Sequence, residues 1–345
     1  MKKLLLPLLI FSFSAVSDEY NANYFSNTIT ENDLKRHLTF LASDSLRGRL
    51  AGSIEQKVAA EYIAKHFWEN GLTAVVPESD TINKFSYFQP FYIKEYFGSQ
   101  YSVMLNPSEK MRKGIGVIST ENVLGFLEGT DKKEEVLVIS AHYDHIGTMN
   151  DIVFNGADDD GSGTVAMMEI AQAFTEAKKK GKATRRSILF IAFTGEECGL
   201  LGSEYYTEKP IFPLRKTICD LNIDMIGRID NEHIKQPNYV YLIRSYRKTK
   251  LLRDISVEMN QNSVNLNLDY TYNSESHPLQ LYSRSDHYNF VKNNVPFIFY
   301  FDGIHPDYHA PTDDVERIDF TLLKKRTDLI FHTAWEIANQ EGNIR

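Results

Sequence analysis

The chain has little cysteine, and this limits the covalent bonds that could stabilise it. Only Cys198 and Cys219 occur among its 345 residues. Cys198 follows the end of one expected strand, whereas Cys219 lies inside another, about 16 Å from the end of that strand at ~3.3 Å per residue. A disulfide needs Cα atoms closer than about 7 Å. We therefore expect two free thiols.

Basic residues are also in the minority. The chain has 38 Lys and Arg residues against 46 Asp and Glu residues, which gives a net charge of −8. This balance argues against nucleic acid or an anionic membrane as the main partner. Repeats, low-complexity tracts and proline-rich linkers are absent from the sequence as well. The composition, 42% hydrophobic and 24% charged, is that of a globular protein with an ample core.

Long apolar runs are lacking except near the N-terminus. Lys2 and Lys3 precede an apolar run over residues 4–13, and Ala15-Val16-Ser17 resembles a cleavage site. This pattern is typical of a secretory signal peptide covering residues 1–17, and the run is too short to span a bilayer. We expect a secreted or periplasmic protein whose mature chain, residues 18–345, forms a single domain. No cysteine adjoins the cleavage site, so we expect no membrane anchor.

What the sequence does contain is an alternation of strand and helix. Apolar runs predict buried strands at 122–127, 136–141, 187–193, 217–224 and 295–300. Amphipathic patterns predict helices after Thr30, at 54–70, at 162–179, from about 200, at 251–260 and at 318–339. The alternation predicts an α/β fold, a three-layer helix–sheet–helix domain around a mixed, largely parallel sheet. We expect the first two strands to be adjacent, and residues 229–282 to form a polar excursion.

Histidines and acids gather where these strands end. The residues are His142, the pair Glu196 and Glu197, Asp224, His309, and the loop acids at 158–160. Because parallel strands end at one edge of a sheet, we expect these side chains to converge. Packed acids repel one another, and a cation is the natural compensation.

The chemistry of these side chains indicates the kind of cation. Histidine and carboxylate ligands without thiolate suit Zn²⁺, and also Co²⁺ or Mn²⁺. Three carboxylates and one hydroxide would balance two divalent ions. The D-D-D-G stretch alone could be a solvated turn, since Asp and Gly dominate turns. It does not fit an EF-hand, because with Gly161 at position six the first position would be Gly156 and the twelfth Met167 instead of acids.

Five motifs in this order resemble the co-catalytic zinc aminopeptidases of metallopeptidase clan MH. They are H-Y-D at 142–144, D-D-G-S-G at 159–163, G-E-E at 195–197, N-I-D at 222–224 and Y-H-A-P-T-D at 308–313. The stretches S-D-H at 285–287 and L-R-G-R at 46–49 are also similar to that family. The resemblance extends over roughly residues 30–340, and the relatives include bacterial leucyl aminopeptidases and glutamate carboxypeptidases.

The resemblance implies a zinc-peptidase-like fold with two Zn²⁺ ions per chain. One ion would be held by His142 and Asp224, and the other by Glu197 and His309. Asp159 would bridge the two ions, immediately before a cis peptide bond to Asp160.

The resemblance also implies the catalytic roles. Glu196 would be the general base on the bridging water, and Tyr308 would donate a hydrogen bond to the oxyanion. The substrate would be a peptide or a small amide, and the reaction most consistent with the motifs is aminopeptidase hydrolysis.

Strand geometry gives one further expectation, apart from the resemblance. The carboxylate of Asp144 lies two residues after His142, on the same side of an extended chain, and should orient the imidazole.

Several alternatives stay open at this point. The residues do not separate an aminopeptidase from a carboxypeptidase or a dipeptidase, and they leave the oligomeric state open. A single-zinc glutaminyl cyclase and a non-catalytic binding ectodomain are the other functions of this fold, although Tyr308 and the D-D-G-S-G loop favour a peptidase.

The remaining polar residues receive weaker assignments. We expect Asp158 and Asp160 to support the loop, and leave the role of His145 open. Asp286 and His287 should either line the substrate pocket or begin a helix. The other histidines on helices and loops are expected to be ordinary core or surface residues: His37, His66, His233, His277 and His332.

Overall fold

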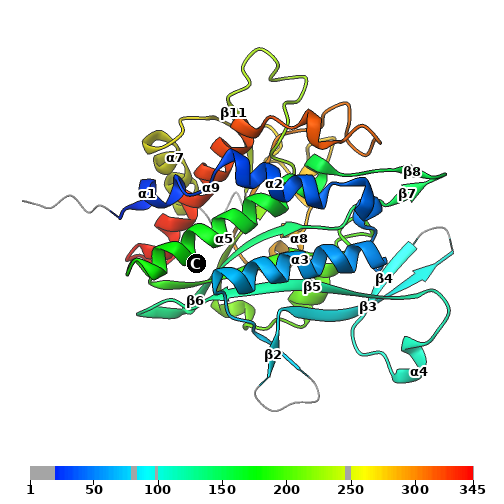
Figure 1. The fold of residues 1–345 in the computed structure, drawn as a ribbon. Helices are drawn as coiled ribbons and strands as arrows, with labels where there is room; N and C mark the ends of the chain where they lie inside the picture. Colours follow the sequence, from blue (N-terminus) through cyan, green and yellow to red (C-terminus); the bar gives the residue numbers. More distant parts are fainter. Residues whose placement is uncertain (1–19, 79–83, 98–99, 245–249, 345) are drawn as a thin grey trace, which may run out of the picture.

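A nine-stranded mixed sheet forms the middle layer of the molecule (Figure 1). The computed structural model describes residues 20–78, 84–97, 100–244 and 250–344, so the expected signal peptide lies outside the described residues. In spatial order the strands are β12 (Asn267–Asp269), β11 (Tyr239–Arg244), β13 (Phe297–Phe301), β10 (Thr217–Ile223), β6 (Lys132–His142), β9 (Arg186–Phe193), β5 (Val117–Leu127), β3 (Phe88–Tyr96) and β4 (Gln100–Met104). The four central strands β13, β10, β6 and β9 are parallel, and antiparallel pairs join them to both flanks.

Helices cover both faces of this sheet, which confirms the predicted three-layer α/β architecture. One face carries α1 (Ala22–Ser26), α2 (Glu31–Leu41), α3 (Ile54–Asn70), α5 (Gly163–Lys179), α7 (Lys250–Asn262) and α9 (Phe320–Asn339). The other face carries α6 (Leu201–Glu208) and α8 (His287–Lys292). Short elements complete the chain: β1 (Val76–Pro77), β2 (Phe85–Ser86), α4 (Glu109–Arg112), β7 (Thr148–Met149) and β8 (Ile152–Val153).

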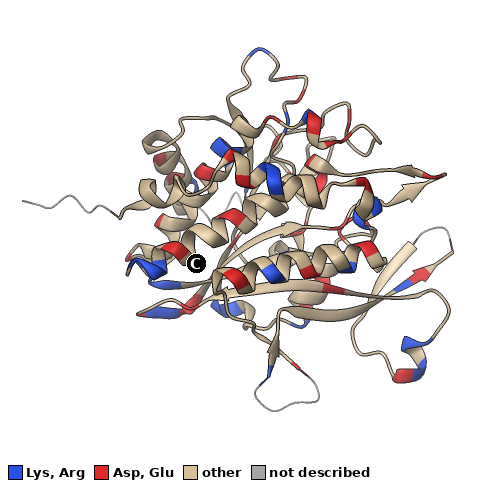
Figure 2. Ribbon diagram, viewed as in Figure 1, with Lys and Arg blue, Asp and Glu red and all other residues tan. Residues whose placement is uncertain are grey.

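The helix boundaries follow from local signals in the sequence. Thr30 caps α2 by accepting a hydrogen bond from the backbone N–H of Asp33 at 3.0 Å. Ser53 caps α3 in the same way, and Gly71 ends that helix with a φ of 86°, a conformation that glycine adopts without strain. Acidic and basic residues alternate along α3 (Figure 2), while Ala59, Ile63 and other apolar residues face the core. These boundaries agree with the predicted ones.

Two expectations about the sheet are wrong. The strands expected at 122–127 and 136–141, now β5 and β6, are not neighbours, because β9 pairs with both and lies between them. The region 229–282 is not merely an excursion, because it adds β11 and β12 to the main sheet. Both errors concern strand pairing between segments that are distant in sequence.

Two further findings concern the thiols and the membrane. Both cysteines are free, as expected. In the part of the chain that the structure describes, none of the helices combines the length and apolar character needed to cross a membrane.

Candidate metal centre

The register of the parallel strands brings the polar strand ends to one edge of the sheet. His142, the last residue of β6, is paired with Phe193 of β9, three residues before Glu196. Asp224 directly follows β10, whose Ile223 is paired with Tyr300 of β13. The segment Ala157–Ser162, which carries Asp159, leads into α5 beside these ends. The convergence predicted from the sequence is therefore present.

His142 faces two carboxylates at distances suited to a shared metal ion. Its Nε2 atom lies 3.3 Å from Oδ1 of Asp159 and 3.5 Å from Oδ1 of Asp224. Zinc ligands lie about 2.0–2.1 Å from the ion, so two ligands of a tetrahedral site are about 3.3 Å apart.

The other oxygen of Asp159 faces a second group of the same kind. His309 Nε2 lies 3.0 Å from Asp159 Oδ2 and 3.2 Å from Oε2 of Glu197. Asp159 thus presents one carboxylate oxygen to each histidine. We call the whole group the edge centre; its members are His142, Asp159, Glu196, Glu197, Asp224 and His309.

The donor atoms of the edge centre fit a divalent cation. Asp159 Oδ2 and Glu197 Oε1 are buried and form no hydrogen bond of good geometry within the described part of the chain, although His309 Nε2 and His145 Nδ1 lie 3.0 Å and 2.7 Å from them. A buried carboxylate without a donor is strongly destabilising unless a charge compensates it. Imidazole nitrogens and carboxylate oxygens together are the donor set that zinc prefers.

The pKa values of Glu196 and His309 at the edge centre are both raised, for different reasons. Burial, together with the charges of Glu197 and Asp224, raises the pKa of Glu196 well above its usual value, although His142 opposes this. Burial alone would lower the pKa of His309, but Asp159 and Glu197 outweigh it and raise the pKa to about 10. Clusters of such perturbed groups in a cleft mark functional sites.

The acids beside Asp159 support the loop, as predicted. Asp160 accepts hydrogen bonds from the backbone N–H groups of His142 (3.1 Å), Gly163 (2.9 Å) and Met225 (3.0 Å). Asp158 accepts from Gly227 N–H at 2.7 Å. The peptide bond between Asp159 and Asp160 is cis, as the resemblance implies.

Steric crowding requires a glycine at Gly163, the last position of the D-D-G-S-G motif. A Cβ atom on Gly163 would lie 2.4 Å from Oδ1 of Asp160 and 2.6 Å from the carbonyl oxygen of Ile223. Any larger residue would therefore push the Asp160 carboxylate out of the position in which it ties β6, α5 and the residue after Asp224 together.

The expected role of the Asp144 carboxylate is wrong in detail. The Nδ1 atom of His142 lies 3.1 Å from the backbone carbonyl oxygen of Asp144, whereas the carboxylate is 3.8 Å away. That carboxylate instead accepts a hydrogen bond from the backbone N–H of Glu196 at 3.3 Å. The chain turns after β6, so strand alternation no longer governs the direction of Asp144.

Sequence reasoning missed the contributions of His145 and Arg49. His145 Nδ1 lies 2.7 Å from Oε1 of Glu197, and the closely spaced histidines of H-Y-D-H are the only sequence signal for this. Arg49 is 1% exposed and donates to the carbonyl oxygens of Tyr143 (2.8 Å), Asn155 (2.7 Å) and Gly156 (3.0 Å). It therefore holds the segments on both sides of the edge centre, which explains the L-R-G-R stretch.

A pocket opens beside the edge centre. Its walls include Glu196 and Tyr308, and its apolar side is formed by Met225, Leu281, Phe299 and Ile304. The ring of Tyr308 stacks on that of His309 with centroids 3.9 Å apart.

The S-D-H stretch does not line this pocket. Asp286 precedes α8 without forming a side-chain cap, and its carboxylate is buried. The Nε2 atom of His287 lies 2.9 Å from the carbonyl oxygen of Tyr282, and the ring stacks on Phe297 and Phe299, so this histidine belongs to the core.

Comparison with known proteins finds similarity to peptidases. Residues 122–334 match the model of peptidase family M28. The chain is 28% identical over 214 residues to a probable leucine aminopeptidase of Arthroderma otae. The aligned region covers 60% of this chain and 55% of that protein. It is 26% identical over 237 residues to aminopeptidase YwaD of Bacillus subtilis, and the aligned region covers 65% of this chain and 46% of that protein. The chain thus spans about half the length of these curated relatives.

A solved structure shows the same fold. The Legionella pneumophila LapA aminopeptidase superimposes with a TM-score of 0.68 at 18% identity, covering 99% of this chain and 79% of that one.

Proposed function

Because the chain belongs to peptidase family M28, we propose that it is a dinuclear zinc exopeptidase, and specifically an aminopeptidase. The observation that carries this proposal is the edge centre. There, two histidines and three carboxylates from separate strand ends and loops approach one another at 3.0 to 3.5 Å. The relatives named as leucine aminopeptidases support the choice of an aminopeptidase.

We assign the five ligands to two ions. His142 and Asp224 would hold one ion, Glu197 and His309 the other, and Asp159 would bridge them. Zinc at these positions would polarise the scissile carbonyl and acidify water. The two oxygens of Asp159 face different histidines, which favours two ions over one.

The remaining residues would handle the proton and the developing charge. Glu196 lies next to His142 and Asp224 and lines the pocket, so its carboxylate can take the proton of the attacking water and deliver it to the leaving amine. The hydroxyl of Tyr308, in the same pocket, would donate to the oxyanion.

The apolar wall of the pocket supports a preference for an apolar N-terminal side chain. Leu281, Phe299 and Ile304 would contact that side chain and exclude water from it. The glutaminyl cyclase alternative has only the fold in its favour. The number of zinc ions lost when the ligands of the edge centre are removed would separate one edge ion from two.

Export by an N-terminal signal peptide is part of the proposal, on the pattern of Lys2, Lys3 and the following apolar run. The mass of the protein recovered outside the cytoplasm would then correspond to a chain that begins near Asp18.

A panel of substrates tests the activity. The protein with added Zn²⁺ should hydrolyse aminoacyl amides and peptides with a free α-amine, with the highest kcat/KM for apolar first residues. Matched N-acetylated peptides should be inert. Cleavage of the N-acetylated peptides from their C-terminal end would instead establish a carboxypeptidase, and cyclisation of N-terminal glutamine would establish a cyclase.

A further inference from the structure

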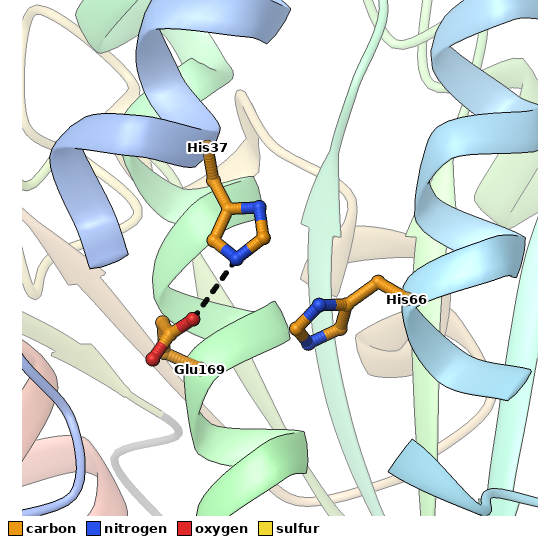
Figure 3. A group of neighbouring side chains, drawn as sticks. All are labelled: His37, His66 and Glu169. Atoms are coloured by element: carbon orange, nitrogen blue, oxygen red, sulfur yellow. Dashed lines mark ion pairs between the residues drawn. The ribbon is translucent and has the colours of Figure 1, made fainter. Parts of the chain in front are cut away.

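A second group of buried ligand-type side chains lies away from the edge centre. Figure 3 shows His37 of α2, His66 of α3 and Glu169 of α5 directed toward one another. Their side chains are almost completely enclosed, with exposures of 5%, 7% and 0%. One ligand atom from each lies within 4.8 Å of the others. We call these three residues the helix cluster.

The carboxylate of Glu169 lacks the partners that a buried anion needs. Neither of its oxygens accepts a hydrogen bond from the described part of the chain, although Oε1 lies 3.1 Å from Nε2 of His37. Burying a carboxylate without donors is unfavourable by several kcal/mol unless a positive charge compensates it.

The hydrogen bonds around His37 indicate that Nε2 carries a lone pair. The guanidinium of Arg36, which can only donate, lies 3.1 Å from that nitrogen. The other nitrogen, Nδ1, lies 2.7 Å from the hydroxyl of Tyr62. With the hydrogen on Nδ1, the Nε2 atom and the Glu169 oxygen are two acceptors in contact. Arg36 itself is largely exposed and paired with Asp33 at 2.9 Å.

The hydrogen bonds of His66 likewise indicate which ring nitrogen carries a lone pair. Its Nε2 atom lies 3.0 Å from the carbonyl oxygen of Met168 and 3.3 Å from the side-chain amide nitrogen of Asn70. The nearer partner, the carbonyl oxygen, can only accept, which favours the hydrogen on Nε2 and the lone pair on Nδ1. A metal-binding histidine usually donates its second ring N–H to an oxygen in this manner. Both histidines of the helix cluster meet that description.

We propose that the helix cluster is a structural Zn²⁺ site, formed by one ring nitrogen each from His37 and His66 and a carboxylate oxygen of Glu169. Two imidazoles and one carboxylate suit zinc, and a water molecule can complete the tetrahedron. The 3.1 Å separation between His37 and Glu169 is close to the about 3.3 Å expected of two such ligands. Harder cations such as Mg²⁺ and Ca²⁺ prefer oxygen ligands.

The position of the site indicates what the ion would do. Glu169 lies six residues after Gly163, about 9 Å along α5, and α5 begins directly after the segment that carries Asp159. An ion held by α2, α3 and α5 would fasten these helices together and hold the start of α5 in place. It would stabilise the fold without contacting substrate.

Zinc content measures this site independently of the edge centre. In a His142→Ala/His309→Ala background, which removes a ligand from each proposed edge ion, metal-stripped protein dialysed against Zn²⁺ should retain about one ion per chain. Adding Glu169→Gln or His66→Ala should abolish it. His332→Ala, a change of another buried histidine, should leave the content unchanged. Equal zinc content with and without Glu169→Gln would overturn the site, whatever the fate of the proposed peptidase activity.

A thermal test separates a metal from a simple ion pair. In the otherwise unchanged chain, Glu169→Gln should lower the melting temperature in Zn²⁺ by at least a few degrees but not in the presence of a chelator, because the uncharged amide avoids the cost of an uncompensated anion. A protonated His37 paired with Glu169 would predict the same loss of stability in both conditions, and that result would refute the zinc site.

Discussion

The edge centre and the helix cluster use the same ligand types in different surroundings. The ligands of the edge centre follow strands or lie in loops, and an open pocket lies beside them. Those of the helix cluster project from three helices into a closed space. The edge centre also contains Glu196, and Tyr308 lines the pocket beside it; neither has a counterpart in the helix cluster. An opening and a proton carrier therefore distinguish a site for chemistry from a site for stability.

The two groups also differ in how their ligands are supported. At the edge centre, Asp160 and Arg49 hold loops in position through backbone hydrogen bonds. In the helix cluster, helix packing does this, together with hydrogen bonds of the two rings to Tyr62, Arg36, Met168 and Asn70. Loop-borne ligands need this dense support because a loop has no regular backbone hydrogen bonds of its own.

Removal of metal should have the largest effect on activity. A chelator should reduce hydrolysis to the uncatalysed background, because the proposed mechanism depends on the edge ions for polarisation of the carbonyl. Zn²⁺ should restore activity, whereas Mg²⁺ or Ca²⁺ should not. Initial rates on a free-amine peptide, measured against zinc content, check this. Full activity in zinc-free protein would contradict the assignment of the edge centre.

Glu196→Gln should be the next most damaging change. Loss of the proton carrier should lower kcat by about 10²- to 10⁴-fold, since general acid–base catalysis contributes about that much. The zinc content should be unchanged, because Glu196 is not assigned as a ligand. Glu204→Gln, on α6, is the matched control and should be neutral. A variant that loses zinc along with activity would show that Glu196 binds metal instead.

Tyr308→Phe should produce a smaller loss. Removing one donor to the oxyanion should lower kcat by about 10²-fold with little change in KM, because the hydrogen bond would form mainly in the transition state. Tyr288→Phe, another partly buried tyrosine near this pocket, should leave kcat unchanged. Steady-state kinetics of both variants decide the point, and equal kcat values would remove Tyr308 from the mechanism.

His66→Ala should have the smallest effect on activity. With Zn²⁺ present and below the melting temperature, kcat/KM should stay within about twofold of the unchanged chain, since distant sites usually act independently. The comparison between the two groups predicts loss of heat stability without loss of catalysis. A large drop in kcat/KM in folded protein would mean that the helix cluster acts on the reaction as well.

Much of the fold could be predicted from local patterns. The period of apolar residues located the central strands and main helices, and caps such as Thr30 and Gly71 marked helix ends. The convergence of His142, Asp224, His309 and the pair Glu196 and Glu197 was predictable for a related reason, whereas the choice of Asp159 among the loop acids came from the family resemblance. A buried strand ends visibly in the sequence, and the carboxyl ends of parallel strands must share one edge.

The tertiary structure alone decided which distant segments meet. The insertion of β9 between β5 and β6, and the addition of β11 and β12 to the sheet, depend on pairing between segments far apart in the chain. The sequence indicates only ordinary histidines at positions 37 and 66. Residues 37, 66 and 169 occupy inward positions that any amphipathic helix would have. A local pattern records which face of a helix is buried. Only packing determines which other buried faces it meets, and so which ligands come within reach of one ion.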